Sequence, residues 1–138
     1  MAAIQFEIES YTATAIRDCL PNANQARYEI TLTSKDQGHG IRFTARLIFE
    51  DPVGPNEKSY LLNLEGLNYD PRKLVVLLNT GDFSSFYQVL SMENPVYIWF
   101  VYKDTVSNDL STGLPLKSHQ IIQFQLKTGS EVPGDFEK

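Results

Sequence analysis

Residues 96–102 read Val96-Tyr97-Ile98-Trp99-Phe100-Val101-Tyr102, an unbroken run of seven apolar or aromatic side chains. Side chains of a β-strand point alternately to its two faces, so a strand with this sequence is apolar on both faces. The other strand-like segments of the chain are apolar on one face only. We therefore expect residues 96–102 to be covered from both sides, by the core of a sheet on one face and by a further layer on the other.

Alternating apolar and polar residues predict more strands around this ribbon. The even-numbered positions from Ile4 to Ile16 form one face of a long first strand. Residues 28–32 and 41–49 alternate in the same way on either side of Gly38-His39-Gly40, which predicts a β-hairpin. We predict a fourth strand at residues 60–64 and a last one at residues 116–126.

Two segments between these strands have a helical pattern. Asp70-Pro71 offers an N-cap and a first-turn proline, and Gly81 follows where a helix would end, so we predict a helix over residues 71–79. The next segment has one apolar helical face, formed by Phe83, Phe86, Tyr87 and Leu90. The expected fold is an α+β domain, with about six strands in a twisted antiparallel sheet that can curl toward a barrel. Two short helices between the fourth and fifth strands would cover one face of the sheet or plug one end.

Length and charge limit the function classes. A chain of 138 residues matches a single domain, which we place at residues 1–127, followed by a mobile tail at residues 128–138. The net charge of −5 makes nucleic acid an unexpected partner. No apolar run is long enough to cross a membrane, and Cys19 is the only cysteine. Since the first residues lack the pattern of a signal peptide, we expect a cytoplasmic protein.

No catalytic, metal or cofactor motif is visible. His39 and His119 are the only histidines, and neither has a second metal ligand at a recognised spacing. Cys19 has no neighbouring base that would activate its thiol. Glu7 and Glu9 alternate on the polar face of the first strand, where solvated acids are expected. We therefore expect no metal site, no cofactor and no catalytic residues.

A binding surface is the more specific hypothesis. Tyr97, Trp99 and Val101 share the second face of the apolar ribbon, and Arg42 and Arg46 share the polar face of the third strand. If these strands are neighbours, the five side chains form a surface for a ligand or a partner, since Arg, Tyr and Trp are enriched at interfaces. The alternative is that the arginines pair across the sheet with the carboxylates of Glu7, Glu9 or Glu29.

Three functions follow from these observations. The first is a non-catalytic interaction module, in which a second copy of the chain, another protein or the helical pair covers the stripe at Tyr97, Trp99 and Val101. The second is a barrel that binds a small apolar or aromatic ligand among its aromatic residues. The third is a small hydrolase or lyase that uses His39, His119 or the polar loop predicted at residues 104–113.

Overall fold

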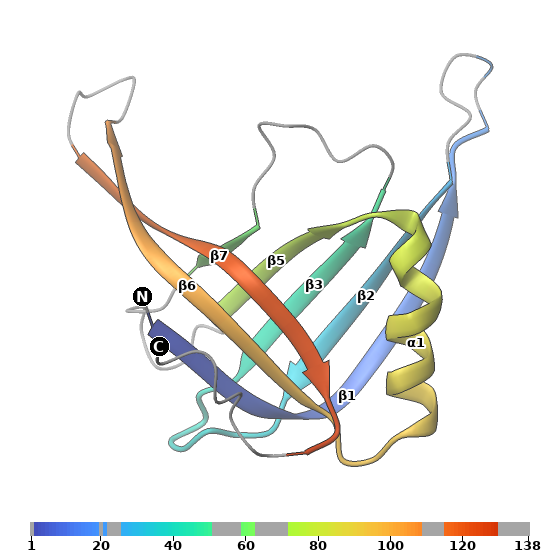
Figure 1. Ribbon diagram of the computed structural model, residues 1–138, viewed down its shortest axis with the longest axis horizontal. Helices are drawn as coiled ribbons and strands as arrows, with labels where there is room; N and C mark the ends of the chain where they lie inside the picture. The colour runs from blue at the N-terminus through green and yellow to red at the C-terminus, as the bar shows by residue number, and fades with distance from the viewer. Residues whose placement is uncertain are drawn as a thin grey trace.

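The computed structural model describes residues 2–19, 21, 26–50, 59–62, 72–108 and 115–129 of the chain. These residues form a closed barrel of seven strands with one α-helix packed against it (Figure 1). In chain order the elements are β1 (Ala2–Arg17), β2 (Ala26–Ser34), β3 (Phe43–Phe49), β4 (Tyr60–Leu62), β5 (Arg72–Leu78), a 3₁₀ turn (Thr80–Asp82), α1 (Phe83–Met92), β6 (Tyr97–Asn108) and β7 (Pro115–Lys127). The predicted class, a curled sheet with a small helical part, is confirmed in outline, but the strand and helix numbers differ.

Around the barrel the strands follow the order β1-β2-β3-β5-β4-β7-β6, and β6 pairs with β1 to close it. All neighbours are antiparallel except β3 and β5, which run parallel. The predicted hairpin is present as β2 and β3. Its turn holds Gly38, His39 and Gly40 at positive φ, a region that glycine enters without steric cost. The Asp36 carboxylate accepts hydrogen bonds from the N–H groups of Gly38, at 2.7 Å, and Gly40, at 3.1 Å.

The helix predicted over residues 71–79 is wrong, because residues 72–78 form strand β5. Leu74 and Val76 point into the core and are 0% and 3% exposed, while Val75 and Leu77 on the other face are half-buried. An apolar run that is covered on both faces has no clear period, so its sequence does not separate a strand from a buried helix. The ladders to β3 and β4 give this segment backbone partners that favour the strand.

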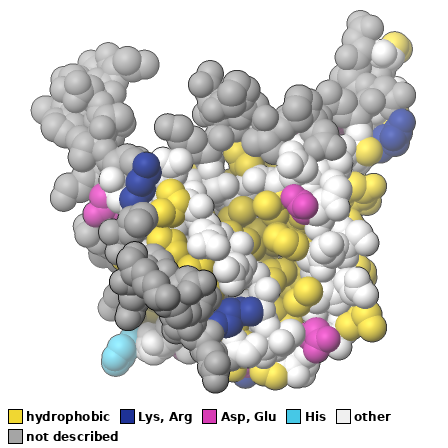
Figure 2. Space-filling view, in the orientation of Figure 1, with side chains coloured by type: hydrophobic (Ala, Val, Ile, Leu, Met, Phe, Trp, Pro, Cys, Tyr) yellow, Lys and Arg dark blue, Asp and Glu magenta, His cyan; other side chains and the backbone are white. Residues whose placement is uncertain are grey.

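The second predicted helix is confirmed as α1. The Phe83 ring stacks on Tyr28 at 4.4 Å, and Phe86 lies 5.8 Å from Phe49 and 6.1 Å from Phe124 between ring centroids. Within the described residues, β4 pairs with His119 and Gln120 of β7, and Figure 1 shows α1 beside the later part of β7. Hydrophobic side chains gather on the surface between these two elements (Figure 2). Helix α1 therefore covers the barrel beside the later part of β7, where Phe86 contacts Phe124.

The interior of the barrel is filled by side chains. Phe6 stacks on Phe43 at 4.6 Å, and Phe100 meets both rings edge-on at 6.3 Å. The buried cluster around them takes residues from all seven strands and from α1. These three aromatic side chains therefore pack against one another inside the barrel.

A β-bulge interrupts β1. The pairing of β1 with β2 shifts register between Ile8 and Ser10, and the next residue, Tyr11, lies opposite the fully buried Leu32. A bulge adds one residue to one strand of a pair and changes which side chains face the core. The single even-numbered face predicted from Ile4 to Ile16 therefore ends at the bulge.

The apolar ribbon continues into polar sequence. Strand β6 runs to Asn108 in a ladder with β7, so the polar loop predicted from residue 104 starts too early. Three predicted segments lie outside the described residues: the rest of that loop, residues 63 and 64 of the fourth strand, and residues 130–138 of the tail. In the part of the chain that is described, no helix is both long and apolar enough to span a membrane.

Candidate functional site

The surface predicted from the sequence lies on the outer face of β6. Trp99 is 1% exposed and Val101 is 2% exposed, while Tyr97 is half-buried. On the inner face, Ile98 and Phe100 have no exposed surface. The expected burial of this strand on both faces is confirmed for these residues, and a single chain achieves it.

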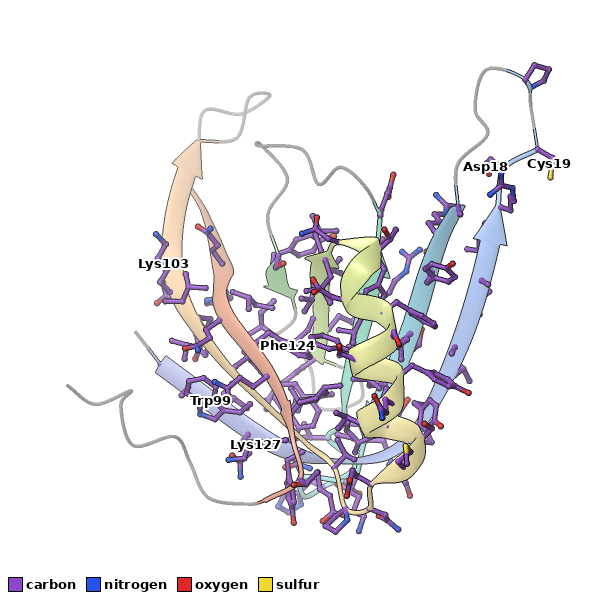
Figure 3. All side chains as sticks on the ribbon, turned by 45° about the vertical axis from the view of Figure 1, so that its right-hand side comes forward. Asp18, Cys19, Trp99, Lys103, Phe124 and Lys127 are labelled. Atoms are coloured by element: carbon purple, nitrogen blue, oxygen red, sulfur yellow. The ribbon has the colours of Figure 1, made fainter. Side chains whose placement is uncertain are left out.

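Side chains of the flanking strands contribute to the outer cover. Gln5 of β1 and Gln125 of β7 lie opposite Trp99 in register. Lys127 Nζ donates a hydrogen bond of 3.0 Å to Gln5 Oε1, which joins β7 to β1 across β6. Figure 3 shows Trp99 on the side of β6 turned away from α1, whereas Phe124 lies toward the helix. Of the alternatives that the sequence left open for the cover of Trp99, α1 is therefore not the one that covers it.

The two arginines do not join this surface. Strands β1 and β2 lie between β6 and β3, so Arg42 and Arg46 are not beside the aromatic residues of β6. Arg42 forms an ion pair with Glu9, and Arg46 donates to both carboxylate oxygens of Glu29, at 2.6 Å and 3.2 Å. The hydrogen bond to Glu29 raises the pKa of Arg46 above its ordinary value despite partial desolvation. The alternative of cross-sheet ion pairs is thus confirmed for both arginines.

The histidines have different surroundings. His39 is exposed in the β2–β3 turn at φ 57°. His119 of β7 lies opposite Asp104 of β6, with its Nδ1 atom 2.5 Å from Asp104 Oδ1, and its ring meets Tyr102 edge-on at 5.5 Å. The His119 side chain is 17% exposed and that of Asp104 is 70% exposed. A carboxylate at Nδ1 orients an imidazole and leaves Nε2 as the working nitrogen.

Sequence reasoning did not pair Asp104 with His119, because it ended the strand before Asp104. The available signal was the adjacent β-branched pair Thr105 and Val106 beyond Tyr102, which favours continuation of the strand. Within the described residues, no group of three or more His, Cys, Asp or Glu side chains is arranged to hold a metal ion. The geometry of the Asp104–His119 pair therefore favours a role in proton transfer over a role as a metal ligand.

A cleft of about 320 Å³ opens between the bulge of β1 and the C-terminal end of α1. Its apolar part consists of Ile8, Leu90 and Val96, and the last two are each 6% exposed. The Ile8 N–H donates to the carbonyl of Val96 at 2.9 Å, which ties β1 to the residues that enter β6. Glu93 N–H donates to the carbonyl of Val89 at 3.1 Å and ends the helix. Backbone hydrogen bonds therefore fix the walls of the cleft.

The rest of the lining is polar and acidic. It consists of Glu9, Ser10, Tyr11, Ser91, Glu93 and Asn94. No lysine, arginine or histidine occurs among the described residues that line the cleft. Arg42, which pairs with Glu9, lies outside the lining, and its Nη1 atom also donates to the carbonyl of Ser34 at 2.9 Å. The cleft therefore has an apolar floor and a rim that carries carboxylate and hydroxyl groups.

Sequence reasoning missed this cleft. Glu9 fits a solvated strand face as well as a binding site, and the two halves of the lining, residues 8–11 and 90–96, are far apart in the chain. The one local signal is Tyr11, an aromatic residue on the face that the even-numbered pattern assigns to polar side chains.

Comparison of the chain with known protein families, curated proteins and solved structures finds no match.

Proposed function

We propose that the chain is a non-catalytic interaction module that binds its partner through the cleft between β1 and α1. The observation that supports this is the cleft itself, which has a volume of about 320 Å³, an apolar base and a hydrogen-bonding rim. Small-molecule sites span roughly 300–1,000 Å³. A cleft at the lower end of this range suits one side chain or a short segment of a partner protein better than a large apolar ligand.

The position of the cleft in the fold also supports this proposal. Leu90 of α1 and Val96 before β6 belong to the buried core, so the base of the cleft is part of the rigid barrel. Sites on strands and helices keep their geometry better than sites on loops. Bulges such as the one at Ile8 and Ser10 occur often beside functional sites, because they re-aim side chains.

Self-association, which the apolar stripe predicts, stays a prediction. Trp99 and Val101 are buried within one chain, so covering them does not require a second copy. Light scattering distinguishes the protomer mass of 15.7 kDa from a multiple of it.

Two tryptophan variants on one helix test the proposed function. Ser91 lines the cleft, whereas Ser85 is exposed on α1 and is not part of the lining. Pools of short peptides and small organic fragments would be added to the ¹⁵N-labelled chain, and ligands would be identified by shifts of amide resonances in residues 8–11 and 90–96. Ser91→Trp should fill the cleft and abolish these shifts, while Ser85→Trp, which introduces the same side chain elsewhere on α1, should preserve them. Ligands that bind both variants equally, or no ligand at the cleft, would refute the proposal.

The contact between Asp104 and His119 favours a second candidate function, a hydrolase or lyase with His119 as the base. Asp104 holds Nδ1 at 2.5 Å, which orients the imidazole for proton transfer through Nε2. A positioned base contributes about 10²–10⁴-fold to a rate. In a screen of chromogenic esters and amides, His119→Ala should therefore lower any activity by at least about a hundredfold, and His39→Ala should leave it unchanged. Equal rates for both variants would exclude this candidate.

A further inference from the structure

We infer that the cleft between β1 and α1 accepts a primary ammonium group on an aliphatic stem, the chemistry of a lysine side chain in a partner protein. This inference rests on the proposed function, because it names the group that the cleft would bind.

The charge of the lining supports a cationic group. Glu9 lies on β1 and Glu93 follows α1, so the two carboxylates come from different walls of the cleft. An ammonium group has three donors and no acceptor, and carboxylates and hydroxyl oxygens match it. A negatively charged ligand would meet both carboxylates with no basic residue among the described lining to offset them. Glu9 is already engaged by Arg42, so we assign the larger share of ammonium binding to Glu93.

The apolar base supports an aliphatic stem. Ile8, Leu90 and Val96 provide aliphatic surface below the polar rim, and Leu90 and Val96 are almost fully buried. Lysine side chains characteristically lay their methylene groups on apolar surface while the charged end stays in polar surroundings. The volume of about 320 Å³ is ample for one lysine side chain and lies at the lower end of the range for small-molecule sites.

Tyr11 adds an aromatic ring to the lining. It lines the cleft, and its ring meets Tyr87 of α1 edge-on at a centroid distance of 6.4 Å. An aromatic face attracts an ammonium group through its quadrupole. The neutral analogue of a lysine side chain would lose this attraction together with that of the carboxylates.

The test uses the full chain and two probes that differ only in the group at the end of the side chain. Nα-acetyl-lysine amide and Nα-acetyl-norleucine amide share the aliphatic stem, but norleucine lacks the ammonium group. We expect the lysine probe to shift the amide resonances of residues 8–11 and 90–96 with a Kd in the millimolar range, about 1 mM. The norleucine probe should bind at least about tenfold more weakly, and added salt should weaken only the lysine probe.

Matched charge variants assign the effect to the cleft. Glu93→Gln should weaken binding of the lysine probe about fivefold, as expected for a partly exposed ion pair. Glu29→Gln removes the same charge from the outer wall, where Glu29 pairs with Arg46, and should leave the affinity unchanged. Equal weakening by both variants would mean that only the net charge of the chain matters and would overturn the inference.

The outcomes separate the inference from the proposed function. If both probes bind the cleft equally, or if other ligands bind there and the lysine probe does not, the ammonium inference fails and the interaction module stands. If no ligand of any class shifts the resonances of residues 8–11 and 90–96, both fail.

Discussion

Replacement of Trp99 by alanine should remove a large part of the stability of the barrel. The side chain is 1% exposed, although it lies on the outer face of β6. A buried aromatic side chain removes about 200 Å² from water, which at about 25 cal/mol per Å² corresponds to about 5 kcal/mol. Substitutions of buried aromatic residues by alanine cost about 3–5 kcal/mol. We therefore expect Trp99→Ala to lower the free energy of unfolding by about 4 kcal/mol, against a total of about 5–15 kcal/mol for a typical domain.

Urea denaturation followed by circular dichroism measures this loss, because the variant lacks the only tryptophan of the chain. Ile122→Ala on the adjacent strand β7 is the control: Ile122 is 43% exposed, and we expect a loss below about 1 kcal/mol. A loss below about 1 kcal/mol for Trp99→Ala as well would refute the reasoning. In the parent chain, quenching of Trp99 by acrylamide should stay low on dilution. Quenching that rises as the chain is diluted would show that a second copy provides the cover.

Two further predictions concern the end of the β2–β3 hairpin. Ser34 is fully buried and its hydroxyl accepts a hydrogen bond from Phe43 N–H at 2.8 Å, so Ser34→Ala should leave a buried donor unpaired and cost about 1–3 kcal/mol in urea denaturation. Thr33→Ala, at the half-buried neighbouring position, should cost less, and equal losses would contradict this account. The hydrogen bond and the charge of Glu7 raise the pKa of the Lys35 ammonium above its ordinary value of 10.5. Because the folded pKa is the higher one, the pair stabilises the chain fully below pH 10.5, and this contribution is lost as the pH rises through the folded pKa. A ¹³C NMR titration of Lys35 should show the raised pKa in the parent and not in Glu7→Gln.

Structural features that follow from a single local pattern of residues could be predicted from the sequence. The unbroken run at residues 96–102 specified burial on both faces, and the strand in the structure has buried side chains on both. The alternation on both sides of Gly38-His39-Gly40 specified the hairpin, because positive φ angles at the glycines allow a tight return. The apolar face of α1 was also visible, since four aromatic or aliphatic residues recur at helical spacing.

Strand β5 shows where local reasoning fails. Asp70-Pro71 and Gly81 flank it as they would a short helix, and its own residues are mostly apolar, but it pairs with β3 over seven residues in parallel. Parallel neighbours are not consecutive in sequence, so nothing near residues 72–78 indicates that β3 is available as a partner. The hydrogen bonds and burial that such a partner supplies outweigh weak helix propensity.

The candidate site lies where the local pattern of β1 breaks. Up to Ile8 the even-numbered residues of β1 face the core, and after the bulge Tyr11 lies opposite a core residue of β2. A strand that kept its period would retain Glu9 on the outer wall and turn Tyr11 away from the helix. With the extra residue, Glu9 and Tyr11 both line the cleft, and Tyr11 contacts Tyr87 of α1.

Deletion of one residue at the bulge would restore the alternation and is expected to remove the cleft while the closed barrel is retained. Breaks of this kind are expected where a sequence departs from the requirements of the fold to build a site. The bulge therefore favours a binding role for the cleft over an accidental gap between strand and helix.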